Sequence, residues 1–292
     1  MAEHVLVLGG GLAGVAAALR LGDEGVDVTL VDRNDYHQFQ PLLYQVASSQ
    51  LPVEDIARPH RTIFQGYPSV TVLTADVAAA TLSERRLVLA DGQTLTGSHV
   101  VVAAGARPNF FGVPGAAEHA FPLYSVADAE RLRRHLQQLL QEAMDGEGPG
   151  DPGTLDVVVV GGGPTGVETT GALAELMHAL QQTGRLERPG QITIVDRGKA
   201  LLAPFSSESH EYSHRKLTEA GAVVRLETGV SAVHADRVEF DDSSTIPART
   251  TVWGGGESGA AIAQNAGPAP GHGGRLDVRP DLTVEGYPGV YA

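Results

Sequence analysis

Runs of apolar, mostly β-branched residues recur along the chain at intervals that leave room for helices between them. The clearest runs cover residues 5–8, 26–31, 99–103, 157–160 and 192–195. They are apolar at nearly every position, which is typical of parallel strands that are buried on both faces. Two of the runs lead into glycines and then into small and apolar residues that favour a helix. This alternation predicts an α/β fold.

One unit of this pattern occurs twice. The first copy reads VLVLGGGLAGVAAALRLGDEGVDVTLVDR over 5–33, and the second reads VVVVGGGPTGVETTGALAEL over 157–176, followed by ITIVDR over 192–197. Each copy is a strand, a G-x-G-x-x-G turn, a helix and a second strand that ends in Asp. The segments after the two copies also match, because each predicts short strands and then a final apolar strand. Repetition of whole units predicts two related domains.

We therefore expect two Rossmann-like domains of the three-layer ββα type that binds FAD and NAD(P), each interrupted by a small antiparallel meander. One domain is discontinuous, 1–112 plus 256–292, and the other spans 113–255. Ser125 is expected to begin a helix, with Asp128 as its partner in a capping box. Residues 275–292 predict two short strands.

The glycine spacing indicates dinucleotide binding. The first glycine permits a tight turn, the second lets the backbone approach a pyrophosphate, and the third lets the helix pack on the strand. The phosphates then lie at the helix N-terminus. Asp32 and Asp196 end the following strands, where a ribose-binding acid is expected, and the alternative is a glycine-rich turn without a ligand. The glycines are Gly9, Gly11 and Gly14 in the first copy and Gly161, Gly163 and Gly166 in the second.

Three features near these turns bear on the chemistry. Asp196 would repel a 2′-phosphate and favours NADH over NADPH, whereas Arg197 could accept a 2′-phosphate. Glu168 is either a first-turn carboxylate stabilised by the helix dipole or a carboxylate near a nicotinamide. The uncharged polar and aromatic segment 37–45 is either loop packing or a surface for a flavin or a flat acceptor.

Composition excludes several function classes. The net charge of −14 opposes binding to nucleic acid and to anionic membrane surfaces. The chain has no cysteine, which excludes disulfides, thiolate metal sites and a redox-active dithiol. The histidines show no metal-ligating spacing, so no metal is expected. No window of the sequence holds about 18 uninterrupted apolar residues, so no transmembrane helix is predicted.

Several longer motifs resemble the type II NADH dehydrogenases, the single-subunit NADH:quinone oxidoreductases. They are FQPLLYQVA at 39–47, PLYSVADAERLRRHL at 122–136, VVVGGGPTGVE at 158–168 and TTVWGGG at 250–256. GGGPTGVE is shared across the wider group of flavoproteins with two dinucleotide domains, and FQPLLYQVA is the discriminating stretch. The resemblance covers nearly all of the chain. It implies that the first domain holds FAD and the second NADH, with hydride transfer to the flavin and electron transfer to a membrane quinone of the respiratory chain.

The resemblance extends to individual residues. Glu168 matches a carboxylate at the contact between nicotinamide and flavin, and Pro41 to Gln45 match a segment that lines the flavin and the quinone approach. Glu168 and Gln45 are therefore the candidate catalytic residues. The candidate FAD-binding residues are Gly9, Gly11, Leu12, Ala13, Gly14, Asp32, Arg33, Pro41, Leu42, Val77, Ala104 and Gly105. The candidate NADH-binding residues are Gly161, Gly163, Pro164, Thr165, Gly166, Asp196, Arg197, Gly254 and Gly255.

The chain departs from the family pattern at its C-terminus. Family members continue beyond the position of Ala292 into a flavin-contacting acid and into quinone-site and membrane-docking helices, so we expect a truncated chain. The full-length protein is expected to be peripheral on the cytoplasmic face of the membrane, and family members often form homodimers through parts that this chain lacks. Two alternatives share the same glycines: an NADH-dependent reductase of a ferredoxin or rubredoxin, and a non-catalytic cofactor-binding fragment. Disulfide reductases and sulfide:quinone reductases of this architecture need thiols, which this chain lacks.

Overall fold

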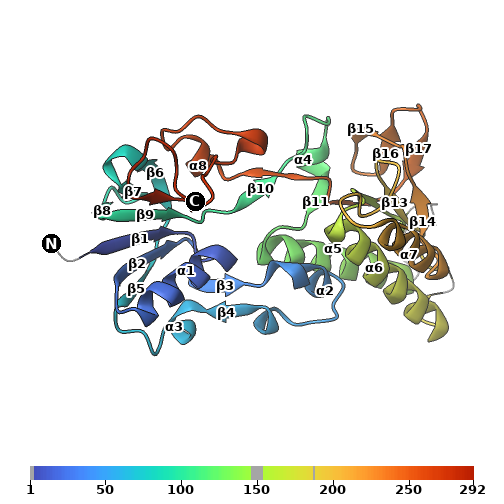
Figure 1. Ribbon diagram of the computed structural model, residues 1–292. Coiled ribbons are helices and arrows are strands. Elements are labelled where there is room, and N and C mark those ends of the chain that lie inside the picture. The colour runs from blue at the N-terminus through green and yellow to red at the C-terminus, as the bar shows by residue number, and fades with distance from the viewer. Residues whose placement is uncertain (1–2, 146–153, 187) are drawn as a thin grey trace. The chain divides into compact units, whose positions relative to one another are not determined.

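The computed structural model describes residues 3–145, 154–186 and 188–292, drawn in Figure 1. The chain forms two compact units. The first unit comprises Met1–Phe39, Glu54–Arg107 and Glu257–Ala292, and the second comprises Gln40–Val53 and Pro108–Gly256. Each unit contains one of the two glycine turns.

The first unit is built on a five-stranded parallel sheet with the strand order β20-β9-β1-β2-β5. Helix α1 (Leu12–Asp23) packs on one face of this sheet, and an antiparallel three-stranded meander, β6-β7-β8, packs on the other. The bounds of the sheet strands are β1 His4–Leu8, β2 Asp27–Asp32, β5 Val70–Thr74, β9 His99–Val102 and β20 Val290–Tyr291. The meander strands are β6 Val77–Thr81, β7 Arg86–Leu89 and β8 Thr94–Thr96.

Strand β1 shows why the central positions of these strands are mostly apolar. Leu6 and Leu8 belong to the core formed with the meander, whereas Val5 and Val7 belong to the core formed with α1. Successive side chains of a strand point to opposite faces. Because both faces of the sheet are covered, the four residues that follow His4 in β1 are all buried, and the polar alternation of a half-exposed strand is absent from them.

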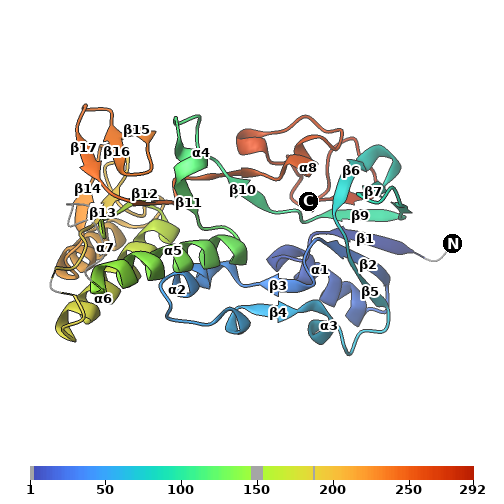
Figure 2. The same cartoon turned by 180° about the vertical axis from the view of Figure 1, so that it is seen from behind.

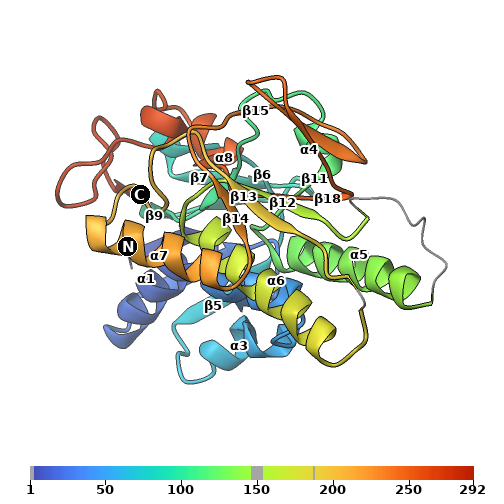
Figure 3. The same cartoon turned by 90° about the vertical axis from the view of Figure 1, so that its right-hand side faces the viewer.

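The second unit repeats this design with the strand order β11-β18-β12-β13-β14, again all parallel. Three helices lie together along one side of the sheet in Figure 3, and the meander β15-β16-β17 packs on the other. The helices are α5 Val126–Met144, α6 Pro164–Gln182 and α7 Ser207–Glu219. The strands are β11 Ala120–Pro122, β12 Val157–Val160, β13 Ile192–Val195, β14 Val223–Arg225, β15 Val230–Val233, β16 Arg237–Phe240, β17 Thr245–Pro247 and β18 Thr250–Trp253.

The expected fold class, two three-layer ββα units, is thus confirmed. The capping box of α5 is also present. The backbone N–H of Asp128 donates to the Ser125 hydroxyl at 3.1 Å, and the Ser125 N–H donates to the Asp128 carboxylate at 3.0 Å.

The segment between β2 and β5 leaves the first unit and returns. Strands β3 (Tyr36–Gln38) and β4 (Ala57–Pro59) pair antiparallel in the first unit, and α3 (His60–Ile63) follows them. Between the two strands, the 3₁₀ turn η1 (Gln40–Leu42) and helix α2 (Leu43–Ala47) belong to the second unit. Helix α2 packs against α5 and α6 and lies alongside α5 in Figure 2.

The expected strands in 275–292 are mostly wrong. Only β20 is a strand, and the rest of the segment makes isolated bridges between Val278 and Val284 and between Thr283 and Tyr291. Side-chain and glycine turns interrupt the pairing here, since the Asp281 carboxylate accepts from the Thr283 N–H at 3.1 Å and Gly286 has φ 80°.

The remaining elements are short. They are η2 Val53–Asp55, η3 Leu82–Glu84, β10 Ala106–Pro108 paired with β19 Glu257–Gly259, α4 Ala116–His119, α8 Ala261–Gln264 and η4 His272–Gly274. Within the described residues, no helix is both long enough and apolar enough to cross a bilayer.

Candidate functional site

The two glycine turns have the same geometry at their first position. Gly9 has φ 103° and Gly161 has φ 107°, values that residues with a Cβ atom rarely adopt. A Cβ atom at Gly9 would lie 2.3 Å from the carbonyl oxygen of Ala103, and one at Gly161 would lie 2.5 Å from that of Gly254. Conformation and space therefore both require glycine at these positions.

The other glycines divide into two kinds. A Cβ atom at Gly14 or Gly166 would lie 1.8 Å from the carbonyl oxygen of the first glycine of its own turn, so these positions allow the helix to pack closely. Gly11 and Gly163, which cap α1 and α6, face open space, with no described atom within 4 Å of an added Cβ. Because the first-turn N–H groups of a helix have no intrahelical acceptor, each helix start offers a phosphate both donors and room.

In the first unit, the Asp32 side chain holds the glycine turn by hydrogen bonds. Its carboxylate accepts from the backbone N–H of Gly10 at 2.5 Å and from that of Asn34 at 2.7 Å. The Gly10 carbonyl oxygen lies 3.1 Å from Nδ1 of His37 and 3.2 Å from Nε2 of His60. His60 is fully buried, and sequence reasoning did not identify it, because a single histidine after a proline carries no recognisable pattern.

The second unit fastens its turn in the same way. The Asp196 carboxylate accepts from the Gly162 N–H at 2.5 Å and from the Gly198 N–H at 2.6 Å. Here the backbone N–H of Leu202 donates to the Gly162 carbonyl oxygen at 2.7 Å, where the first unit uses histidines. A carboxylate has about four lone-pair sites, so Asp196 retains acceptor capacity for ribose hydroxyls.

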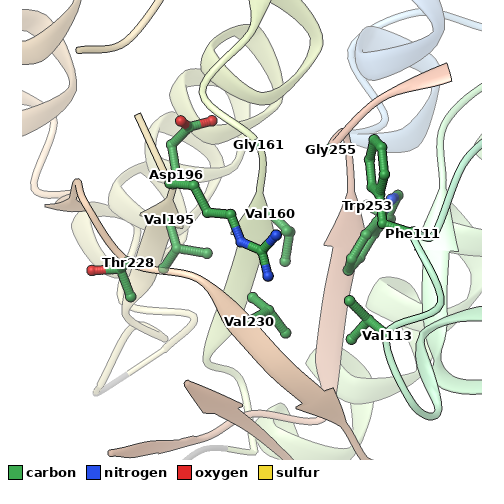
Figure 4. A pocket seen from close by; sticks show the side chains of 11 residues that line it. Phe111, Val113, Val160, Gly161, Val195, Asp196, Thr228, Val230, Trp253 and Gly255 are labelled. Atoms are coloured by element: carbon green, nitrogen blue, oxygen red, sulfur yellow. The ribbon is translucent and has the colours of Figure 1, made fainter. Parts of the chain in front are cut away.

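A cavity of about 360 Å³ lies in the second unit at the carboxyl end of the sheet. It brings together four of the predicted NADH-binding residues: Gly161, Asp196, Arg197 and Gly255. Figure 4 shows Asp196 with Val195 and Thr228 on one side, and Trp253 with Phe111 and Val113 on the other. Arg197 is 68% exposed, and its guanidinium lies 3.9 Å from the Asp241 carboxylate. The walls are therefore mostly apolar, with charged groups at one end.

The other predicted residues of this turn lie beside the cavity. Pro164 is the first residue of α6 and Thr165 the second, and Gly254 follows β18. The Gly254 N–H donates to the Val160 carbonyl oxygen at 2.8 Å, which fixes the end of β18 next to the glycine turn.

Glu168 lies in the second turn of α6, because the helix begins at Pro164. The expectation of a first-turn carboxylate is therefore wrong. Its pKa also departs in the direction opposite to dipole stabilisation: although the residue is exposed at the surface, partial burial of its carboxyl raises the pKa above the usual Glu value. This carboxylate binds its proton more tightly than an ordinary surface Glu.

The segment predicted to line the acceptor site packs beside Glu168. Tyr44 and Gln45 lie on α2, which packs against α6. Burial raises the pKa of the Tyr44 phenol, the nearby charge of Glu168 raises it further, and a hydrogen bond with the Gln45 side chain acts in the opposite direction. The structure thus brings the two candidate catalytic residues, Gln45 and Glu168, into one neighbourhood within the second unit.

The candidate FAD residues divide between the units. Pro41 and Leu42 lie in η1 of the second unit, and the others lie in the first. Leu12 and Ala13 are exposed at the start of α1, and Val77 begins β6. Ala104 and Gly105 follow β9 beside Gly9, and Arg33 lies 3.7 Å from Asp76. In the described part of the chain, no group of three or more acidic or histidine side chains is arranged to hold a metal ion.

A family model described as pyridine nucleotide-disulphide oxidoreductase matches residues 3–292. The chain belongs to this family. Its lack of cysteine sets it apart from members that use a dithiol.

Two relatives with more specific names match nearly the whole chain. Two proteins of Mycobacterium tuberculosis, type II NADH:quinone oxidoreductases Ndh and NdhA, are 31% and 32% identical over 99% of this chain. The chain spans only 66% and 65% of their lengths. Among solved structures, NDH2 from Plasmodium falciparum in complex with NADH superposes with a TM-score of 0.86 at 21% identity, covering 100% of this chain and 64% of that one. At that identity, the superposition shows the shared fold alone.

Proposed function

We propose that this protein oxidises NADH with a bound FAD and passes the electrons to a quinone, as a type II NADH:quinone oxidoreductase. The observation that carries the proposal is the duplicated dinucleotide turn, with each copy open at its second glycine, in a chain without cysteine. The names of the mycobacterial relatives support quinone as the acceptor. A protein that reduces a membrane quinone with NADH would act at the cytoplasmic face of the membrane, where NADH is available.

We assign FAD to the first unit and NADH to the second. The residues present fit these groups: Gly11 and Gly163 leave room for a pyrophosphate, and Asp32 and Asp196 keep acceptor capacity beside it. The carboxylate of Asp196 favours the free ribose hydroxyl of NADH over the 2′-phosphate of NADPH. When bound, the nicotinamide supplies a hydride to the flavin, and the flavin supplies paired electrons to the acceptor.

The chain's own residues bind the two dinucleotides and supply a proton to the quinone. The helix starts at α1 and α6 bind phosphates through backbone N–H groups, and Asp32 and Asp196 hold the turns rigid. Burial raises the pKa of Glu168, so this carboxyl, which lies near Tyr44, binds a proton more tightly than an ordinary Glu. Reduction of a quinone to a quinol takes up two protons, so we assign proton donation to Glu168 and orientation of the acceptor to Gln45.

Steady-state oxidation of NADH with different acceptors tests this function. The FAD-loaded protein should oxidise NADH faster with a soluble ubiquinone or menaquinone analogue than with a ferredoxin or a rubredoxin at equal concentration. Faster turnover with either redox protein would replace quinone reductase with the alternative reductase. An absence of turnover with every acceptor, in protein that retains FAD, would favour a non-catalytic role.

A further inference from the structure

Of the two aromatic residues that line the cavity, Phe111 is exposed and Trp253 is buried. Phe111 lines the cavity, and 60% of its surface is accessible, the highest fraction among the large apolar residues of the described chain. Its neighbour Phe110 instead packs on Trp253, with ring centroids 5.5 Å apart. Of two adjacent phenylalanines, one therefore contributes to the core and the other faces the cavity. An exposed aromatic side chain beside an apolar cavity is typical of a ligand-contacting residue.

The turn that carries Phe111 is held at several points. The Asn109 side-chain oxygen accepts from the Phe111 N–H at 2.9 Å, and the Asn109 carbonyl oxygen accepts from Nε1 of Trp253 at 2.9 Å. The Asn109 N–H donates to the Gly256 carbonyl oxygen at 3.0 Å. These hydrogen bonds tie the turn to the end of β18, so the ring is presented by a fixed backbone rather than by a free loop.

The backbone itself is arranged to place the ring at the cavity. Phe111 has φ 50°, in the left-handed region that residues with side chains rarely occupy. Gly256 has φ 147°, and a Cβ atom there would lie 2.8 Å from Cζ of the Phe111 ring. The ring thus occupies space that only glycine at position 256 leaves open.

We propose that Phe111 is an adenine-binding residue whose ring stacks on the base of NADH; this inference rests on the proposed assignment of NADH to the second unit. With NADH in the second unit, Asp196 binds the ribose of the adenosine half. The adenine attached to that ribose then enters the cavity that Asp196 lines. In Figure 4, Phe111 and Trp253 lie across the cavity from Asp196 and Thr228. The flat, apolar faces of adenine match the valine-lined space, and an aromatic ring gains a further contribution from offset stacking.

Binding of ADP-ribose and NADH to the purified chain, measured by calorimetry, tests the inference without requiring turnover. ADP-ribose carries the adenine and lacks the nicotinamide. The Phe111→Ala variant should bind both compounds about tenfold more weakly than the wild type, a loss of ~1.4 kcal/mol of binding free energy, because the adenine loses the ring on which it stacks. Phe111→Tyr keeps the ring and should bind within about twofold of the wild type.

Tyr212→Ala provides the matched control. Tyr212 is a similarly exposed aromatic residue, 55% accessible, on α7 of the same unit and outside the lining of the cavity. This variant should bind both compounds as the wild type does. Unchanged ADP-ribose affinity in Phe111→Ala would overturn the inference and leave the proposed function standing, as would weakening of NADH alone, which would place the ring at the nicotinamide. If the wild type binds neither compound, the proposed function fails and this inference fails with it.

Discussion

Nε2 of His60 lies 3.2 Å from the carbonyl oxygen of Gly10, so a fully buried imidazole supports the middle of the first glycine turn. The ring also packs 6.4 Å from that of Phe64, which belongs to the core under α1. At the matching point of the second turn, the partner of Gly162 is the backbone N–H of Leu202. The first turn therefore depends on a side chain where the second depends on the backbone.

Replacement of His60 by Ala should destabilise the first unit and weaken FAD retention. The change leaves a cavity in the core and removes one hydrogen-bond partner of Gly10, which together cost about 2–4 kcal/mol of unfolding free energy. Urea unfolding and the ratio of flavin to protein after purification measure the two effects. His272→Ala, at an exposed histidine of the same unit, should change neither quantity. Equal stability of the two variants would refute the structural role of His60.

Gly9→Ala and Gly11→Ala should separate folding from cofactor binding. At Gly9 the alanine meets both an unfavourable φ and the Ala103 carbonyl oxygen, so we expect a loss of about 2 kcal/mol or more of stability. At Gly11 no described atom lies within 4 Å of the new Cβ, so stability should stay within about 1 kcal/mol of the wild type. FAD affinity should nevertheless fall in Gly11→Ala, and wild-type FAD affinity there would argue against a phosphate at this helix start.

Glu168→Gln should slow flavin reduction or acceptor turnover without disturbing the fold. Burial raises the pKa of Glu168, so the folded protein binds its proton more tightly than the unfolded chain does. In the wild type, this group therefore reduces stability as pH rises from about 4.3, the ordinary Glu value, through the raised folded pKa. The Gln variant lacks this contribution and should show a flatter pH dependence of stability there. Identical stopped-flow kinetics in the two proteins would remove Glu168 from the mechanism.

The same substitution should lower the pKa of Tyr44. The charge of Glu168 contributes to the raised pKa of the Tyr44 phenol, and the neutral Gln removes that contribution. NMR titration of the protein with labelled tyrosine measures the shift, and Tyr44→Phe assigns the resonance. Because burial is the larger cause, the pKa should stay above 10.0, the ordinary Tyr value, in the variant. No change in the titration would mean that α2 does not hold Tyr44 beside Glu168.

Asp196→Asn should reduce the preference for NADH over NADPH. The substitution removes the negative charge that opposes a 2′-phosphate, while Arg197 remains next to it. It also weakens the hydrogen bonds from Gly162 and Gly198, because an uncharged acceptor is poorer than a carboxylate. The dissociation constants for both nucleotides are the measurement, and a wild type that already prefers NADPH would contradict the assignment to NADH.

The duplicated architecture was predictable because it follows from local pattern. Strands such as β1 and β12 are apolar at nearly every position, each is followed by a glycine turn, and the Ser125 box marks the start of α5. The first and third glycines of each turn are required by contacts within a few residues or with the adjacent strand. Such short-range constraints appear directly in the sequence.

Features that depend on distant contacts were not predictable. Helix α2 has five residues, too few for a helical period, and its place against α5 and α6 follows from burial of Leu43, Val46 and Ala47. His60 meets Gly10 across 50 residues of chain.

The helical turn that contains Glu168 was predictable from the sequence, although it was placed wrongly. Pro164 is typical of the first helical position, which puts Glu168 beyond the first turn.

Anaerobic stopped-flow mixing of the FAD-loaded protein with NADH tests whether the nicotinamide passes its hydride to the flavin. We expect the oxidised flavin absorbance to disappear in a single turnover, at a rate that saturates with NADH concentration. If NADH binds, as shown by calorimetry on the same sample, and the flavin absorbance persists, the two nucleotides do not exchange a hydride and the proposed oxidation of NADH by FAD is wrong.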